Sequence, residues 1–194
     1  MLAALLREVR ACTVCVKYLP LGARPVVRGN AGARLLIISQ APGTRVHETG
    51  LSFNDRSGDR LRGWLGIGRD VFYDEDRVAI LPMGFCYPGV LPNGGDKPPR
   101  PECAPLWHAR LQAQWPSVEL VLLVGSYAID YYLAGTRKPT MTATVAAWRD
   151  YGPRFVPMPH PSWRTTAWER KNPWFVTDML PELRRRVASL VGAP

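Results

Sequence analysis

Residues 34–55 read RLLIISQAPGTRVHETGLSFND, and this stretch predicts both the fold and a site. Leu35–Ile38 is a short, continuous apolar run, as expected for a strand that is buried on both faces. It ends in Ser39-Gln40-Ala41-Pro42-Gly43, where small residues, Pro and Gly turn the backbone out of the strand and leave amide groups free. Ligands gather at such strand ends in open α/β sheets. Phe53 follows, flanked by polar residues, and could stack against a flat ligand. An ordinary strand-to-loop turn is the alternative.

The rest of the chain alternates between apolar runs and helical patterns. Further strands are expected over residues 78–83, 120–124 and 155–158, and helices over residues 2–10, 57–65, 101–111, 127–133, 140–148 and 181–190. This alternation predicts an α/β fold with a mostly parallel sheet and helices on both of its faces. The length of 194 residues suits a single domain, 1–194.

A second polar loop follows the last predicted strand. It reads Pro159-His160-Pro161-Ser162-Trp163-Arg164. Because parallel strands end at the same edge of a sheet, the loops around Gln40 and His160 should open side by side. The sequence therefore predicts that these two loops share one site.

The composition of the chain indicates which binding partners and which cellular compartment to expect. The net charge of +9 favours a polyanionic partner, although a generally solvated basic surface is the alternative. No apolar run approaches the roughly 20 residues that a membrane helix needs, so no membrane contact is expected. The opening MLAALLREVRAC is too charged, and its apolar part too short, for a secretory signal. We therefore expect a cytoplasmic protein, acting as a monomer.

The four cysteines form a pattern typical of a metal or cluster site. Cys12 and Cys15 make a C-x-x-C pair, and Cys86 and Cys103 flank a Pro/Gly-rich loop, VLPNGGDKPPRP at 90–101, for which no regular structure is expected. Structural disulfides are not expected in a chain without an export signal. The C-x-x-C pair does not follow a strand, which argues against a thioredoxin-type redox site. Zinc or an iron–sulfur cluster fits four thiolates, and four unrelated buried cysteines are the alternative.

Taken together, these motifs resemble the uracil-DNA glycosylase superfamily. The pattern is most similar to the iron–sulfur, or family 4, uracil-DNA glycosylases: Gln40-Ala41-Pro42-Gly43 with Gly50 and Phe53 matches their first motif, His160-Pro161-Ser162 their second, and the four cysteines their cluster ligands. The segment ETGLSF also resembles single-strand-selective monofunctional uracil glycosylases. The resemblance implies a three-layer sandwich around a four-stranded sheet, DNA containing a damaged base as partner, and a structural 4Fe–4S cluster on Cys12, Cys15, Cys86 and Cys103, with zinc as the alternative.

The sequence departs from the superfamily patterns at Ala41, at Val46-His47, which replaces the acidic pair of family 4, and at Pro82. Ala41 stands where other branches place Asp or Asn to position the attacking water, a lack that family 4 shares. Pro82 stands where family 4 has the Asn that reads the edge of uracil. Another residue must therefore take over base reading, or the base specificity differs.

The resemblance suggests roles for the loop residues in a monofunctional DNA glycosylase that hydrolyses the N-glycosidic bond of uracil or a related deaminated base. Phe53 would stack on the extruded base, while the turn Gln40-Ala41-Pro42-Gly43 would bind a carbonyl. His160 would stabilise the departing base, with Ser162 beside it in the motif. Neither motif contains a lysine, so a Schiff-base lyase step is not expected.

Four further residues complete the predicted site. Asn54 and Asp55 are candidates to hold the attacking water or to read the base edge. Trp163 stands where the superfamily inserts a wedge into the duplex, although a buried core tryptophan is the alternative, and Arg164 could contact phosphates. Two other functions stay open: a glycosylase-like protein that binds damaged or single-stranded DNA without cutting it, and a metal-dependent module unrelated to DNA.

Overall fold

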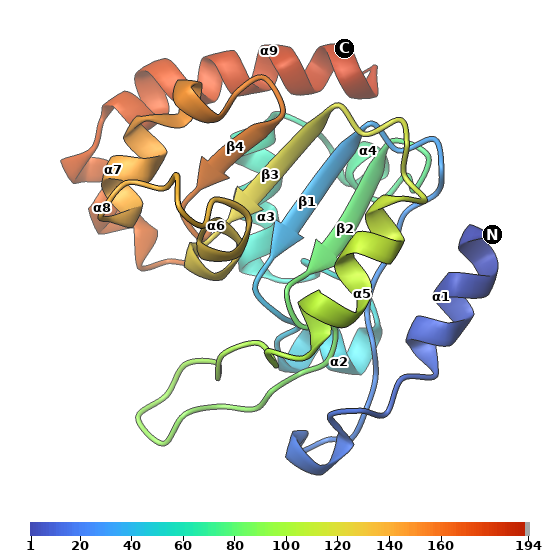
Figure 1. The fold of residues 1–194 in the computed structure, drawn as a ribbon. Coiled ribbons are helices and arrows are strands. Elements are labelled where there is room, and N and C mark those ends of the chain that lie inside the picture. The colour runs from blue at the N-terminus through green and yellow to red at the C-terminus, as the bar shows by residue number, and fades with distance from the viewer. Residues whose placement is uncertain (193–194) are drawn as a thin grey trace.

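The computed structural model describes residues 1–192 and contains a four-stranded sheet (Figure 1). The strands are β1 (Leu35–Ser39), β2 (Val78–Pro82), β3 (Leu120–Val124) and β4 (Phe155–Met158). Their order in the sheet is β2-β1-β3-β4, and every pairing is parallel. The predicted mostly parallel α/β sheet is confirmed, and the strand bounds agree with the prediction to within a residue.

The register aligns the carboxyl ends of the strands. Ser39 of β1 pairs with Pro82 of β2, and Val124 of β3 pairs with Met158 of β4. The segments that follow the four strands therefore leave from one edge of the sheet, where a parallel sheet presents its ligands.

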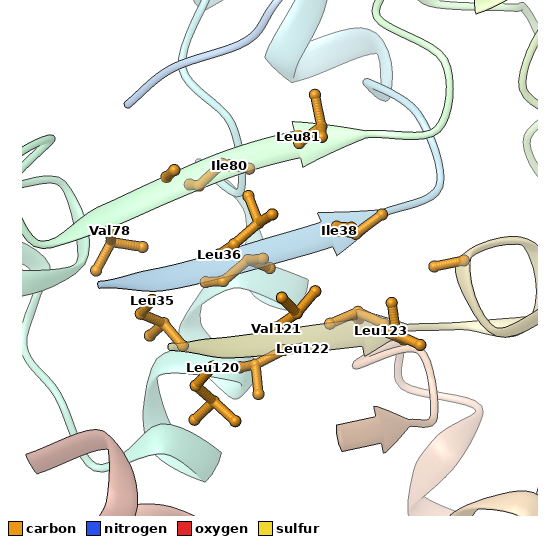
Figure 2. Close-up of a cluster of buried hydrophobic side chains, with 14 of the residues drawn as sticks. Leu35, Leu36, Ile38, Val78, Ile80, Leu81, Leu120, Val121, Leu122 and Leu123 are labelled. Atoms are coloured by element: carbon orange, nitrogen blue, oxygen red, sulfur yellow. The ribbon is translucent and has the colours of Figure 1, made fainter. Parts of the chain in front are cut away.

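The sheet is buried on both faces. Every residue of β1, β2 and β3 is buried, and their side chains project to both sides of the strands in Figure 2. Successive side chains in a strand point to opposite faces, so a strand covered on both sides needs an apolar residue at nearly every position. This explains why the strands read as unbroken runs such as LLII and LVLLV.

Helices cover both faces of the sheet and make three layers (Figure 1). In Figure 1, α5 and α6 lie in front of the sheet and α3 lies behind it; α6 packs on β3 and β1, and α9 packs on β1 and α3. The helices are α1 (Leu2–Arg10), α2 (Thr44–Thr49), α3 (Arg56–Leu65), α4 (Arg69–Phe72), α5 (Cys103–Gln112), α6 (Ser126–Tyr132), α7 (Met141–Ala146), α8 (Thr165–Lys171) and α9 (Leu180–Val191), with short 3-10 turns at Val16–Tyr18 and Trp148–Tyr151 and a π-helical turn at Phe175–Met179. No helix among the described residues is long and apolar enough to cross a membrane.

Several helix predictions need correction. The sequence pattern missed α2, α4 and α8, which are short and belong to the segments that follow β1 and β4 or link α3 to β2. The helix predicted over 140–148 ends at Ala146, and the Thr140 hydroxyl caps its first turn by accepting from the Ala143 N–H at 3.1 Å. The helix predicted from residue 101 begins at Cys103.

The long loop after β2 is more ordered than predicted. Val90 and Asp96 form an antiparallel bridge, the Lys97 N–H donates to the Gly89 carbonyl at 2.8 Å, and the Leu91 N–H donates to the Gly95 carbonyl at 2.9 Å. We call residues 89–97 the hairpin. This segment extends away from the sheet beyond its carboxyl edge in Figure 1. Four consecutive polar or glycine residues, Asn93 to Asp96, allow the tight reversal, but they carry no strand-like alternation that would announce it.

Candidate functional site

The loops after β1 and β4 meet in one pocket at the carboxyl edge of the sheet. The hollow measures about 540 Å³ when counted out to its open mouth. Seven of the predicted site residues line it: Gln40, Ala41, Pro42, Gly43, Phe53, Asp55 and His160. Residues that are 120 positions apart along the chain, such as Gln40 and His160, are thus brought to one small cavity, because β1 and β4 both end at this edge.

The backbone around Phe53 holds its ring against the pocket. Phe53 is buried and has a φ of 56°, in the left-handed region that side chains other than glycine rarely adopt. Its carbonyl accepts hydrogen bonds from the Tyr73 hydroxyl at 3.0 Å and from the Arg62 guanidinium at 3.2 Å. Its ring meets Phe72 edge-on, with 5.9 Å between the ring centroids. These contacts oppose the cost of the strained backbone.

Gly58 makes room for this conformation. A Cβ placed at Gly58, in the first turn of α3, would lie 1.7 Å from the Phe53 carbonyl oxygen. No side chain can occupy that position without moving Phe53. Gly58 therefore allows the first turn of α3 to pack against the backbone of Phe53, which forms the aromatic wall of the pocket.

His160 faces the pocket from the opposite loop. The Ser162 N–H donates to the His160 carbonyl at 2.8 Å and the Thr165 hydroxyl donates to the same oxygen, which fixes the backbone. Among residues 1–192, no hydrogen bond reaches either ring nitrogen. Burial lowers the pKa of His160, and the nearby carboxylates of Asp55 and Asp96 only partly oppose this. The imidazole is therefore neutral at neutral pH and has both nitrogens free for a ligand.

Asn54 and Asp55 occupy different surroundings. The Asp55 carboxylate lines the pocket, and it also caps α3 by accepting from the Gly58 N–H at 2.9 Å. Asn54 does not line the pocket; its Oδ1 accepts from the Arg69 guanidinium at 3.3 Å. The two neighbouring candidates are thus separated by the turn into α3.

The predicted DNA-contacting residues lie beside the pocket. A second hollow shares Gln40 and His160 with the pocket and continues to Arg164. Trp163 is 79% exposed, which excludes the alternative of a core tryptophan. Ser162 does not line either hollow, and its carbonyl accepts from the Arg60 guanidinium at 3.2 Å. The loop after β4 thus presents a ring to the pocket and an indole to solvent.

Sequence reasoning missed part of the pocket wall. Ser39, Val46, Ser52, Ser57, Pro82 and Asp96 also line it. The hydroxyl of Ser52 is buried and has no hydrogen-bond partner among residues 1–192. Asp96 belongs to the hairpin, and the signal that could have found it is the length of this segment, because long loops in compact domains are usually functional. These residues add hydroxyl groups, a valine, a proline and one carboxylate to the pocket wall.

The four cysteines surround a separate hollow. Cys12, Cys15, Cys86 and Cys103 all line it, together with apolar residues that include Leu19 and Phe85, and it shares no lining residue with the pocket. Burial raises the pKa of Cys86 to about 11 and that of Cys103 to about 12, and the neighbouring cysteines add to both increases. The Phe85 N–H points at the Cys103 sulfur, at 3.4 Å.

The cysteine hollow is not a preassembled site for a bare ion. Among residues 1–192, no group of three or more His, Cys, Asp or Glu is close enough to hold a metal ion. The donor set nevertheless fits a larger thiolate-bound group, because four thiols from three segments border one apolar cavity and a backbone N–H supports one sulfur. The four cysteines thus border one cavity, with Cys15 and Cys103 buried and Cys12 and Cys86 partly exposed.

The pocket offers a flat ring, free backbone amides and a neutral imidazole to a small planar ligand. This combination suits a heterocycle with carbonyl groups, and the sequence comparison agrees with it. A family model described as the uracil DNA glycosylase superfamily matches residues 26–184. The match spans the sheet, both pocket loops, the hairpin and two of the four cysteines. The chain therefore belongs to the uracil DNA glycosylase superfamily, and its function is of the DNA glycosylase type.

Proposed function

We propose that the protein is a monofunctional DNA glycosylase that hydrolyses the N-glycosidic bond of uracil or a related deaminated base. The observation that carries this proposal is that Phe53 and His160, from loops far apart in sequence, line the same pocket. Among residues 1–192, no lysine lines that pocket. Water rather than an amine is therefore the expected nucleophile, and the products are the free base and an abasic site.

The base must leave the helix before the bond can be cut. Extrusion into a pocket exposes the glycosidic bond, and damaged or mispaired bases unstack at the lowest cost. Phe53 offers a face on which the extruded ring stacks. The Ala41-Pro42-Gly43 turn offers its free amides to a carbonyl of the base, as the resemblance to the superfamily suggests.

His160 supports the leaving group. As the bond breaks, negative charge builds on the carbonyl oxygens of the base, and a donor already aimed at one of them stabilises the transition state more than the ground state. A neutral imidazole has one N–H to donate, and neither ring nitrogen of His160 makes a hydrogen bond within residues 1–192. Asp55 borders the same space and raises the pKa of His160, which moderates the effect of burial.

DNA would lie across the carboxyl edge of the sheet. The hollow that joins His160 to Arg164 extends the pocket, and the exposed indole of Trp163 is available to fill the gap left by the extruded nucleotide. The net charge of +9 adds a salt-sensitive attraction to phosphates.

We further propose that Cys12, Cys15, Cys86 and Cys103 hold a structural iron–sulfur cluster. Thiols that border a cavity without converging on a single ion favour a polynuclear group over zinc. When bound, such a group would cross-link the N-terminal segment to the segments around β2 and α5. The separation of this hollow from the pocket argues against a part in the chemistry.

Base release tests the glycosylase proposal. Wild-type protein is incubated with oligonucleotides carrying uracil, hypoxanthine, xanthine or a thymine mispair, single- and double-stranded, and free base and abasic sites are measured with and without alkali. We expect release of uracil or of another deaminated base, with strand cleavage only after alkali. The absence of release from every substrate would overturn the proposal.

Ala41 supports a second candidate function. The loop after β1 has Ala41 at the position where other branches of the superfamily hold the attacking water with a carboxylate or amide, and this favours a protein that binds damaged DNA without cutting it. Tight, salt-sensitive binding to the same oligonucleotides without any release would establish that function instead.

Elemental analysis tests the cluster. Protein isolated without oxygen should be brown and contain iron and acid-labile sulfide, and Cys103→Ser should lose both. A colourless preparation with one zinc per chain would show that the cysteines bind zinc instead of a cluster. A preparation with neither iron nor zinc would show that they bind no cofactor.

A further inference from the structure

We propose that Asp96 holds and deprotonates the attacking water, a role that rests on the proposed glycosylase function. It would thereby supply from the hairpin the carboxylate that the loop after β1 lacks at Ala41. The argument starts from the position of Asp96 in the wall of the pocket that also contains Phe53 and His160.

The hairpin fixes where Asp96 lies. Asp96 bridges to Val90 across the hairpin, and the next residue, Lys97, donates its N–H to the Gly89 carbonyl at 2.8 Å. The Lys97 carbonyl lies 3.5 Å from the side-chain amide nitrogen of Gln40, which connects the hairpin to the loop after β1. The backbone of Gln40 is itself tied down, since its carbonyl accepts from the Gly84 N–H at 3.0 Å. The carboxylate is thus carried by an anchored segment.

The Asp96 carboxylate has no partner in the part of the chain that the structure describes. Among residues 1–192, neither a hydrogen bond nor an ion pair engages it, although most acidic side chains of this arginine-rich chain are paired with arginine. The residue keeps much of its surface exposed, so water can reach it. An unpaired carboxylate beside a cavity is available to accept a hydrogen bond from a water molecule that has entered.

The other carboxylate in the pocket is less suitable. Asp55 accepts the Gly58 N–H at 2.9 Å and caps α3, so the helix constrains its orientation. Asn54 lies outside the pocket wall. Of the three side chains that could orient water here, only Asp96 combines a free carboxylate with a place in the wall.

The local charges suit a weak base. Partial burial is the main cause that raises the pKa of Asp96; among the titratable groups nearby, His160 lowers this pKa and the negative charge of Asp55 raises it. A carboxylate with a raised pKa is a better proton acceptor than one in bulk water.

The reaction balances with water as the sole co-reactant. The bond between the sugar C1′ and the base nitrogen breaks, and its electron pair leaves with the base, which His160 stabilises. The water oxygen forms a bond to C1′, and its proton passes to the Asp96 carboxylate. The released base then takes up a proton from solvent, Asp96 returns its proton to solvent, and the products are a hydroxyl-bearing abasic sugar and the neutral base.

Replacement of the carboxylate tests this role. Asp96→Asn keeps the shape of the side chain and removes the base, and we expect single-turnover release to fall by about 100-fold or more while the Kd for the same DNA stays within a few-fold. Asp76→Asn removes the same charge from the turn before β2, at the opposite edge of the sheet, and should release base at the wild-type rate. Formate should partly restore release to Asp96→Ala, which a merely structural role would not allow.

The outcomes separate the two proposals. If Asp96→Asn releases base at the same rate as the wild type, the role of Asp96 is overturned and the glycosylase function is left intact. A denaturant-stable adduct between the protein and the abasic sugar would also overturn it, since Asp96 would then attack C1′ directly. No release by the wild type would overturn both.

Discussion

Two histidines near the carboxyl edge of the sheet have opposite surroundings. His108, on α5, has both ring nitrogens engaged: Nε2 donates to the Pro82 carbonyl at 3.0 Å, and Nδ1 accepts from the Tyr132 hydroxyl at 2.6 Å. Its ring also stacks on Phe85, with the two planes 8° apart. His160 has neither nitrogen bonded to the described protein and borders a cavity.

The contrast separates a histidine that stabilises the fold, His108, from one whose ring nitrogens are available to bind a ligand, His160. Burial lowers the pKa of both histidines, to about 4 for His108, so both are neutral at neutral pH. A satisfied buried polar group stabilises one arrangement of its neighbours, whereas an unsatisfied one costs stability unless something else binds to it. The unpaired imidazole is therefore the better indicator of function.

The largest expected effect is on catalysis. His160→Ala should lower the rate of base release by about 100- to 1,000-fold, because it removes the donor that we propose stabilises the departing base. Its free energy of unfolding should change little, since the ring makes no hydrogen bond within residues 1–192. Single-turnover kinetics and urea unfolding measure the two quantities. Wild-type release by this variant would contradict the role of the imidazole.

The second effect concerns His108, whose contribution to the free energy of unfolding should depend on pH. The unfolded chain protonates His108 below about pH 6.5, while the folded protein resists protonation until about pH 4. Stability should therefore be lost as the pH falls from about 6.5 to about 4, by about 3 kcal/mol from this residue, and the loss should level off below that.

The difference between two unfolding curves isolates this contribution. Urea unfolding of the wild type and of His108→Gln is compared across that pH range, so that other titrating groups largely cancel. The gap between them should narrow on acidification. A gap that does not depend on pH would mean that His108 is not held neutral by the fold.

A glycine pair tests how tightly the aromatic wall is built. Gly58→Ala would place a Cβ against the Phe53 carbonyl, and we expect about 1–3 kcal/mol of destabilisation together with slower base release. Gly63→Ala, in the same helix, meets no atom within 4 Å and should be neutral or stabilising by up to about 1 kcal/mol. Equal effects of the two substitutions would refute the role given to Gly58.

The smallest expected effect is at the surface. Trp163→Ala should weaken binding to uracil-containing DNA by about tenfold, within the range of a lost stacking contact, without changing stability, because the indole is 79% exposed. Leu21→Ala, at a residue that is 53% exposed in the N-terminal segment, is the control. Fluorescence anisotropy at several salt concentrations measures the affinity of both variants for this DNA. An unchanged affinity of Trp163→Ala would show that Trp163 does not contact DNA.

Much of the site could be predicted because its chemistry lies in contiguous segments. The runs LLIIS and LVLLV announce buried parallel strands, and parallel strands must end at a common edge, so the meeting of the Gln40 and His160 loops follows from topology alone. Short helices such as α2 and α8 were missed, because six or seven residues carry too little periodicity to be distinguished from a loop.

The sequence by itself determined the sheet, its parallel direction and the two loops that face each other, since each depends on a local pattern of apolar residues and turns. Only the tertiary structure decided that Asp96 reaches the pocket and that Gly58 makes room for Phe53. It also decided that both ring nitrogens of His108 are hydrogen-bonded, while those of His160 make no hydrogen bond within residues 1–192. Those facts depend on which atoms meet across long stretches of chain. No local propensity encodes such meetings, because packing and hydrogen bonding between distant segments fix them.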